Sequence, residues 1–104
     1  SYNAAISACE KGSLPHEALG LLADMRLRRL EPDVISYNAA ISACEKGGQW
    51  LLALEQLREM RRQRMAPDAI TYNAAISACE KGGQWLLALA QLREMRQQQV
   101  EVDV

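Results

Sequence analysis

The sequence lacks a charge imbalance, has no phenylalanine and contains a single histidine. Its 104 residues include 12 Lys and Arg against 13 Asp and Glu, which leaves a net charge of −1. Domains that hold nucleic acid by bulk electrostatics are usually strongly basic. The composition therefore argues against a tight, nonspecific nucleic-acid binder.

Cysteine is scarce and its spacing fits neither metal binding nor a disulfide framework. Cys9, Cys44 and Cys79 lie 35 residues apart, without a CxxC pair and in an odd number. We interpret them as reduced, small packing residues. His16 has no Cys or carboxylate cluster at ligand spacing beside it, so we expect no metal.

Long apolar runs and catalytic motifs are missing as well. No run approaches the about 18 residues that a membrane span needs, and no targeting segment is visible at the N-terminus. No nucleophile and base pair stands out, and the Gly47-Gly48 doublet is a turn rather than a phosphate-binding loop. We predict that the chain is not an enzyme and has no cofactor, no small-molecule substrate and no membrane partner.

The sequence does contain a repeat. The stretch Ile35–Trp50 returns as Ile70–Trp85 with one change, Ser36 to Thr71, and part of it has already occurred as Ser1–Gly12. The period is 35 residues, and it is marked by Tyr2, Tyr37 and Tyr72. A fixed period of this length indicates an array of stacked units that share one core.

Each unit predicts two helices. The apolar residues of the first helix follow i, i+3, i+4, i+7 spacing, and Gly47-Gly48 then ends it. A second apolar stripe follows, and Pro67-Asp68 closes the unit, where the carboxylate can cap the next first helix. In the middle unit the two stripes are Tyr37, Ala40, Ile41, Cys44 and Trp50, Ala53, Leu54, Leu57, Met60.

Arginine is concentrated in the later half of each second helix. There it complements the helix C-terminus and can pair with Glu59 or Glu94 on a solvated face. A partner-binding patch is the alternative interpretation. The first copy differs in its turn, since Pro15 replaces the tryptophan at the start of the second helix, a position that proline tolerates well.

The unit resembles the pentatricopeptide repeat. The resemblance rests on the opening Val34-Ile35-Ser36-Tyr37-Asn38, on Ala53-Leu54, on Met60 and on the closing Pro67-Asp68. The W-x2-L-G-x2-Y pattern of tetratricopeptide repeats is absent. The resemblance implies an all-α fold, a right-handed α-solenoid of helical hairpins, with repeats at residues 1–33, 34–68 and 69–103.

The resemblance also implies a function, the binding of single-stranded RNA along the first helices with one base read per repeat. In that family the residue after the tyrosine and the last residue of the unit choose the base, and an Asn and Asp combination is similar to the family's combination for uridine. A U-rich RNA is therefore the expected partner. The pairs in this sequence are Asn3 with Asp33, Asn38 with Asp68, and Asn73 with Asp103.

Further roles follow from the same resemblance. Ile35 and Ile70 are expected to sandwich the bases, and Lys11, Lys46 and Lys81 to contact phosphates. The family points to a mitochondrion or plastid, and the exposed ends of an array predict end-to-end self-association.

Each of these roles has a simpler alternative. Asn38 could satisfy local backbone near the helix start, Asp68 could be only an N-cap, and Lys46 could be a solvated partner of Glu45. At the level of the whole chain, the alternatives to RNA binding are a protein-interaction scaffold of the tetratricopeptide type and a stacking spacer within a longer array.

Overall fold

In its described residues the chain folds into three helical hairpins joined by short turns. We describe a computed structural model, which covers residues 1–98 and residue 100. Each hairpin consists of a first helix and a second helix, as the sequence predicts. The six helices are α1 (Tyr2–Lys11), α2 (Pro15–Leu27), α3 (Val34–Lys46), α4 (Trp50–Arg62), α5 (Ala69–Lys81) and α6 (Trp85–Gln97).

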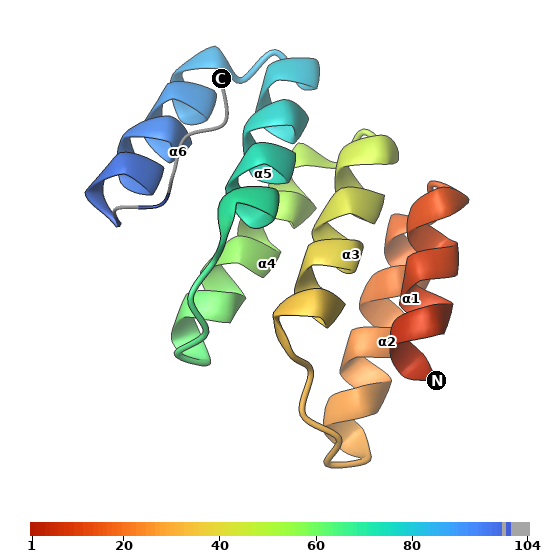
Figure 1. Cartoon of the computed structure of the whole chain (residues 1–104). Helices are drawn as coiled ribbons and strands as arrows, with labels where there is room; N and C mark the ends of the chain where they lie inside the picture. The colour runs from red at the N-terminus through yellow and green to blue at the C-terminus, as the bar shows by residue number, and fades with distance from the viewer. Residues whose placement is uncertain (99, 101–104) are drawn as a thin grey trace.

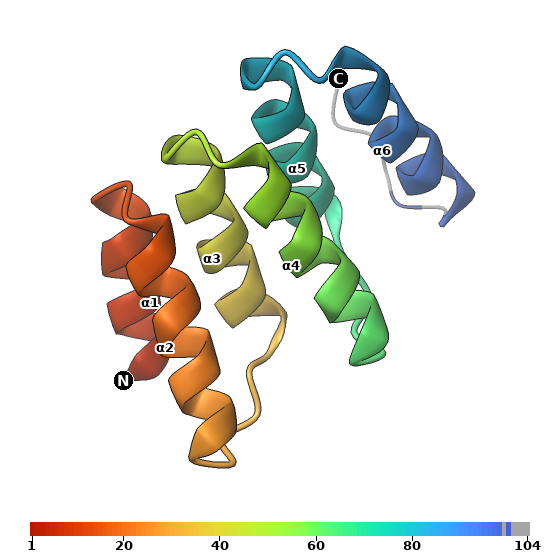
Figure 2. The ribbon, with the colours of Figure 1, turned by 180° about the vertical axis from the view of Figure 1, so that it is seen from behind.

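The first helices α1, α3 and α5 stand side by side in one layer, the second helices α2 and α4 lie behind them, and α6 follows at the end beside α5 (Figures 1 and 2). Helix α3 contacts α1, α2, α4 and α5. Among the described residues no close backbone contact joins α2 to α4 or α4 to α6. First helices therefore pack closer to one another than second helices do, which makes the first-helix layer the inner side of an all-α solenoid.

The core follows the predicted stripe and extends beyond it. Tyr37, Ile41 and Cys44 have no exposed surface. Helix α3 also buries Ser36 and Asn38, which the apolar spacing did not mark. The reason is that α3 has neighbouring helices on several sides, so more than one stripe of its surface is covered.

The predicted helix ends are confirmed. Gly48 and Gly83 take the left-handed conformation, with φ of +71° and +70°, directly after the helix C-caps. Ser13 holds the same place in the first hairpin with φ of +55°, so that turn carries a strain that glycine avoids.

The first glycine of each doublet, Gly47 or Gly82, allows consecutive hairpins to pack closely. A Cβ atom on Gly82 would overlap the Trp50 side chain, with Cγ of that ring only 2.8 Å away, and a Cβ atom on Gly47 would lie 2.7 Å from Cδ of Pro15. The first residue of one second helix thus rests on the bare backbone where the next first helix ends. Trp85, one period later than Trp50, is 71% exposed.

The cysteines are free and buried, as predicted. Burial raises the pKa of the Cys44 thiol to about 11, and the charge of Glu55 adds to this effect. The thiol is therefore protonated at neutral pH, as expected of a packing residue. Within residues 1–98 and 100, no His, Cys, Asp and Glu side chains gather in a group of three that could hold a metal ion.

None of the six helices is both long enough and apolar enough to cross a membrane, a statement that applies to the described part of the chain.

We predict that Gly82→Ala destabilises the protein, because the added methyl group must displace Trp50; overpacking of this kind costs about 1–3 kcal/mol. Gly20→Ala is the matched control. Gly20 lies inside α2, and a Cβ atom there would meet no heavy atom within 4 Å, so alanine should stabilise by about 0.5–1 kcal/mol. Urea unfolding measures both values, and equal effects of the two changes would contradict the stacking role of Gly82.

Candidate nucleic-acid interface

The structure brings the predicted Asn and Asp side chains together across neighbouring hairpins. Nδ2 of Asn38 donates to Oδ1 of Asp68 at 3.1 Å. Nδ2 of Asn3 lies 3.5 Å from Oδ1 of Asp33 in the same arrangement. Each asparagine sits near the start of a first helix, and each aspartate directly precedes the next first helix.

A hydroxyl group that sequence reasoning missed completes each cluster. Oγ of Ser36 donates to Oδ1 of Asn3 at 2.6 Å. Oγ1 of Thr71 donates in the same way to Oδ1 of Asn38. The only sequence signal was that the single difference between two otherwise identical stretches preserves a hydroxyl group.

Each aspartate is also the N-cap of the following helix. Oδ1 of Asp33 accepts the backbone N–H of Ser36 at 2.9 Å, and Oδ1 of Asp68 accepts that of Thr71 at 3.1 Å. In return, the hydroxyl oxygens of Ser36 and Thr71 accept the backbone N–H groups of the two aspartates, which forms a capping box. The N-cap interpretation is therefore confirmed, and the contact with asparagine exists beside it.

These hydrogen bonds lower the pKa of both carboxylates, which are ionised at neutral pH. For Asp33, the backbone and hydroxyl of Ser36 lower the pKa below its ordinary value of 3.8. For Asp68, burial works to raise the pKa, but the hydrogen bonds from Thr71 and Asn38 together lower it. An ionised carboxylate can only accept hydrogen bonds. The atom of Asn38 that faces Asp68 must therefore be the Nδ2 donor.

The three asparagines differ in exposure. Asn38 is 9% exposed, Asn3 is half-buried and Asn73 is exposed. A ligand can thus reach only a narrow part of the Asn38 amide. The predicted partner of Asn73 is Asp103, which lies outside the described residues.

The isoleucines are exposed on the same helices. Ile35 and Ile70 expose 67% and 61% of their surface near the start of α3 and α5. Exposure of this extent is unusual for isoleucine, which is among the residues most often fully buried. Neither isoleucine is therefore part of the core, and both are accessible to a ligand on the first helices.

The lysines of the first helices form ion pairs from one hairpin to the next. Lys46 pairs with Glu10, and Lys81 pairs with Glu45. The alternative that Lys46 pairs with Glu45 is therefore wrong, because adjacent first helices bring residues 36 apart into register. Lys11 is exposed at the end of α1. The ion pairs partly neutralise the positive charge that a phosphate would meet.

Some arginines of the second helices contact nearby acids or tyrosines. Arg62 lies 2.9 Å from Glu59, and Arg61 donates to the hydroxyl of Tyr72 at 2.6 Å and pairs with Glu94. The predicted pairing with glutamates is confirmed for these two arginines.

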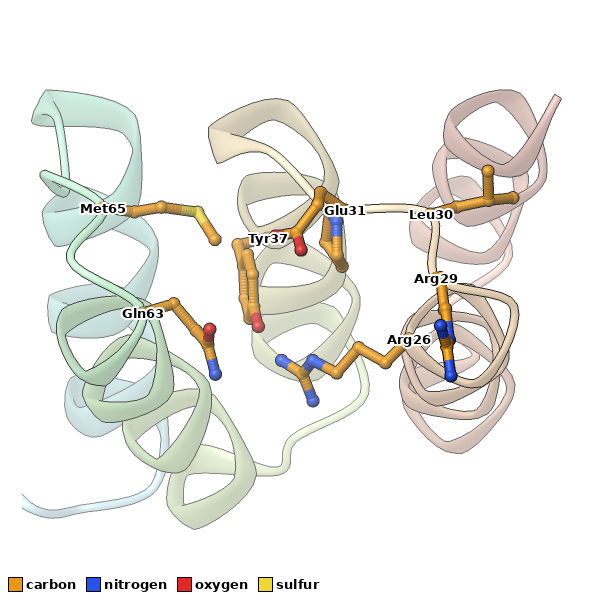
Figure 3. Close-up of a pocket in the computed structure, with 8 residues that line it drawn as sticks. Arg26, Arg29, Leu30, Glu31, Tyr37, Gln63 and Met65 are labelled. Carbon is orange, nitrogen blue, oxygen red and sulfur yellow. The ribbon is translucent and has the colours of Figure 1, made fainter.

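A small cavity of about 90 Å³ lies beside Tyr37 (Figure 3). The guanidinium carbon of Arg26 is 5.4 Å from the centre of the Tyr37 ring, and the Arg26 and Gln63 side chains point toward the end of the ring that carries the hydroxyl. The cavity shares no residue with the cluster of Asn38, Asp68 and Thr71. It is therefore separate from the candidate interface.

The fold and the repeated polar clusters define a helical-repeat binding scaffold, a class that is typically non-enzymatic. The chain belongs to the pentatricopeptide repeat (PPR) family. A model of the PPR repeat family matches residues 1–46 and 32–81, and a model of the PPR repeat matches residues 70–100. Repeats of this family are generally RNA-binding motifs. No curated protein matches the chain significantly.

We predict that the Asp68 carboxylate stabilises the fold above its unfolded pKa of about 3.8 and that this contribution is lost as the pH falls through the lower folded pKa. Asp68→Asn keeps an N-cap acceptor but has no charge to titrate. Its free energy of unfolding should therefore fall less between pH 7 and pH 3 than that of the wild type. Urea unfolding at the two pH values measures the difference, and equal losses would contradict the assigned hydrogen bonds.

Proposed function

We propose that the chain binds single-stranded RNA along its first helices and reads one base per repeat, with each Asn and Asp pair preferring uridine. The observation that supports this most is the recurrence of one polar cluster. Asn3 with Asp33 and Asn38 with Asp68 adopt the same contacts one period apart, both at the start of a first helix. A repeated ligand such as a polynucleotide matches a repeated site.

The chemistry of the amide supports uracil. The Asn38 amide gives one N–H to Asp68 and accepts one hydrogen bond from Thr71. One N–H and one lone pair of the carbonyl oxygen remain for a ligand. Uracil presents an N–H beside a carbonyl oxygen on its Watson–Crick edge, which complements these two positions.

The exposed isoleucines support the placement of the bases. Ile35 lies in the chain between the Asn3 and Asn38 positions, and Ile70 between the Asn38 and Asn73 positions. We propose that Ile35 packs between the first and second bases and Ile70 between the second and third. Asn73 with Asp103 would read the third base.

The lysines would contact the phosphates between these bases. Lys46 and Lys81 would exchange their glutamate partners for phosphate oxygens, and Lys11 would act at the first repeat. We also propose a mitochondrion or plastid as the compartment, since proteins of the family are commonly organellar. End-to-end self-association stays a prediction.

The expected affinity is low. Stacking of a base on an aromatic side chain contributes about 1 to 3 kcal/mol, and an aliphatic sandwich should fall at or below the low end of this range. Three repeats then supply a few kcal/mol before the costs of ordering, which corresponds to about millimolar binding or weaker. Tight binding would need more repeats along one strand.

We predict that the protein binds oligouridine more tightly than oligocytidine or oligoadenosine of the same length. Chemical-shift titration at low salt suits dissociation constants of about 1 mM and gives all three values. The preference over cytidine should be smaller than that over adenosine, because cytosine and uracil have the same size. Equal affinity for the three oligonucleotides would contradict base reading.

Two charge variants provide a matched control. Lys46→Gln and Arg62→Gln each remove one positive charge from a partly exposed ion pair with a glutamate, the first on a first helix and the second on a second helix. Lys46→Gln should weaken oligouridine binding and reduce its salt dependence, whereas Arg62→Gln should leave both unchanged. The opposite result would place the RNA on the second helices.

A further inference from the structure

We propose that the Ser36 and Thr71 hydroxyl groups are specificity-determining: each fixes the orientation of the asparagine amide in the preceding repeat and thereby sets the preference for uridine over cytidine. This inference rests on the proposed function and adds a third residue to each pair. The hydroxyl group does not touch the base. It acts through the amide, so its role is that of a positioning residue.

The hydroxyl groups are buried and fully engaged. Ser36 is 1% exposed and Thr71 is not exposed at all. Each hydroxyl oxygen accepts the N–H of the capping aspartate at 3.1 Å, so its single proton must go to another acceptor. For Ser36 the candidates are Oδ1 of Asn3 at 2.6 Å and Oδ1 of Asp33 at 2.9 Å. The amide oxygen is the nearer of the two.

The hydroxyl and the carboxylate together oppose rotation of the amide by 180°. In the observed orientation Oδ1 of Asn38 receives the Thr71 proton and Nδ2 donates to Asp68. After rotation, Oδ1 would face an ionised carboxylate, so that two acceptors oppose each other, and the Thr71 hydroxyl would keep only Oδ1 of Asp68, at 3.0 Å, as its acceptor. A nearly buried amide oxygen that has lost its donor costs about 1–3 kcal/mol.

The two clusters differ in how closely the carboxylate approaches the amide. In the first cluster the Asn3 to Asp33 distance is 3.5 Å, at the limit of a hydrogen bond, while the Ser36 to Asn3 distance is 2.6 Å. The hydroxyl group is therefore the closer partner of that amide. In the second cluster both contacts are short, and Thr71 is also β-branched, which restricts its side-chain rotamers.

A fixed amide is what distinguishes uracil from cytosine. The two bases have the same shape, but at N3 and at the exocyclic group of C4 uracil offers a donor and an acceptor, while cytosine offers an acceptor and a donor. An amide that rotates freely can match either order. An amide whose oxygen and nitrogen are each held by a protein partner matches only one of them. The hydroxyl group thereby converts a general pyrimidine contact into a uridine preference.

Ser36 and Thr71 share a hydroxyl group and differ by the methyl group of threonine. Between two otherwise identical stretches of 16 residues the only change is Ser36 to Thr71, and both side chains make the same three contacts to Asn and Asp. The methyl group of threonine is therefore dispensable for the cluster. The hydroxyl is the shared feature.

The test uses the wild-type chain, Thr71→Val and Thr71→Ser with the trinucleotides UUU and UCU, whose middle base faces the Asn38 cluster. Valine keeps the shape of threonine and removes the hydroxyl, and serine keeps the hydroxyl. The ratio of the two dissociation constants from chemical-shift titration is the readout. We expect Thr71→Val to reduce the ratio about three- to fivefold, the equivalent of one net hydrogen bond, and Thr71→Ser to retain it.

The outcomes separate this inference from the proposed function. If wild type prefers UUU and Thr71→Val keeps the same ratio, or weakens both ligands equally, the positioning role is overturned while base reading stands. If wild type binds both ligands equally or not at all, the proposed function itself fails.

A second position keeps the test decisive if Thr71→Val unfolds. Ser36→Ala removes the hydroxyl from the first cluster, and the ligands are then CUU and UUC against UUU. One of the two cytidine-containing ligands should gain affinity relative to UUU in the variant. No change for either would overturn the inference.

Discussion

The structure depends on the aspartate that ends each repeat and precedes the first helix of the next. Asp68 caps α5 through the backbone N–H of Thr71 and holds the side chain of Asn38 on the preceding first helix. One ionised group therefore fixes both where a helix starts and how it meets its neighbour. The same group also contacts the amide of the candidate base contact, so that contact lies at the junction of two adjacent first helices.

The stacking of the repeats also requires that consecutive hairpins approach each other closely. Trp50 rests against the backbone at Gly82, and Pro15 rests against that at Gly47. These contacts hold each second helix against the end of the next first helix and keep the first helices adjacent. Along this layer the cluster of Asn3, Asp33 and Ser36 recurs one repeat later as that of Asn38, Asp68 and Thr71.

Periodicity alone predicted the helices, the turns and the central stripe of the core, because local spacing and glycine chemistry decide these features. The resemblance predicted the pairing of Asn38 with Asp68, which the structure brings into contact, although their role in reading bases stays a prediction. The Ser36 and Thr71 hydroxyls, and the ion pair of Lys46 with Glu10, could not be predicted in the same way. They depend on how adjacent first helices are aligned, a property that appears only once the hairpins are stacked.

The central claim is that RNA contacts the amide clusters of the first helices. The most direct measurement is a residue-by-residue map of chemical-shift changes during titration with UUU, including the side-chain amides of the three asparagines. The account predicts the largest changes at Asn3, Asn38 and the exposed isoleucines between the clusters. Changes confined to the arginines of the second helices, with the asparagine amides unmoved, would contradict it.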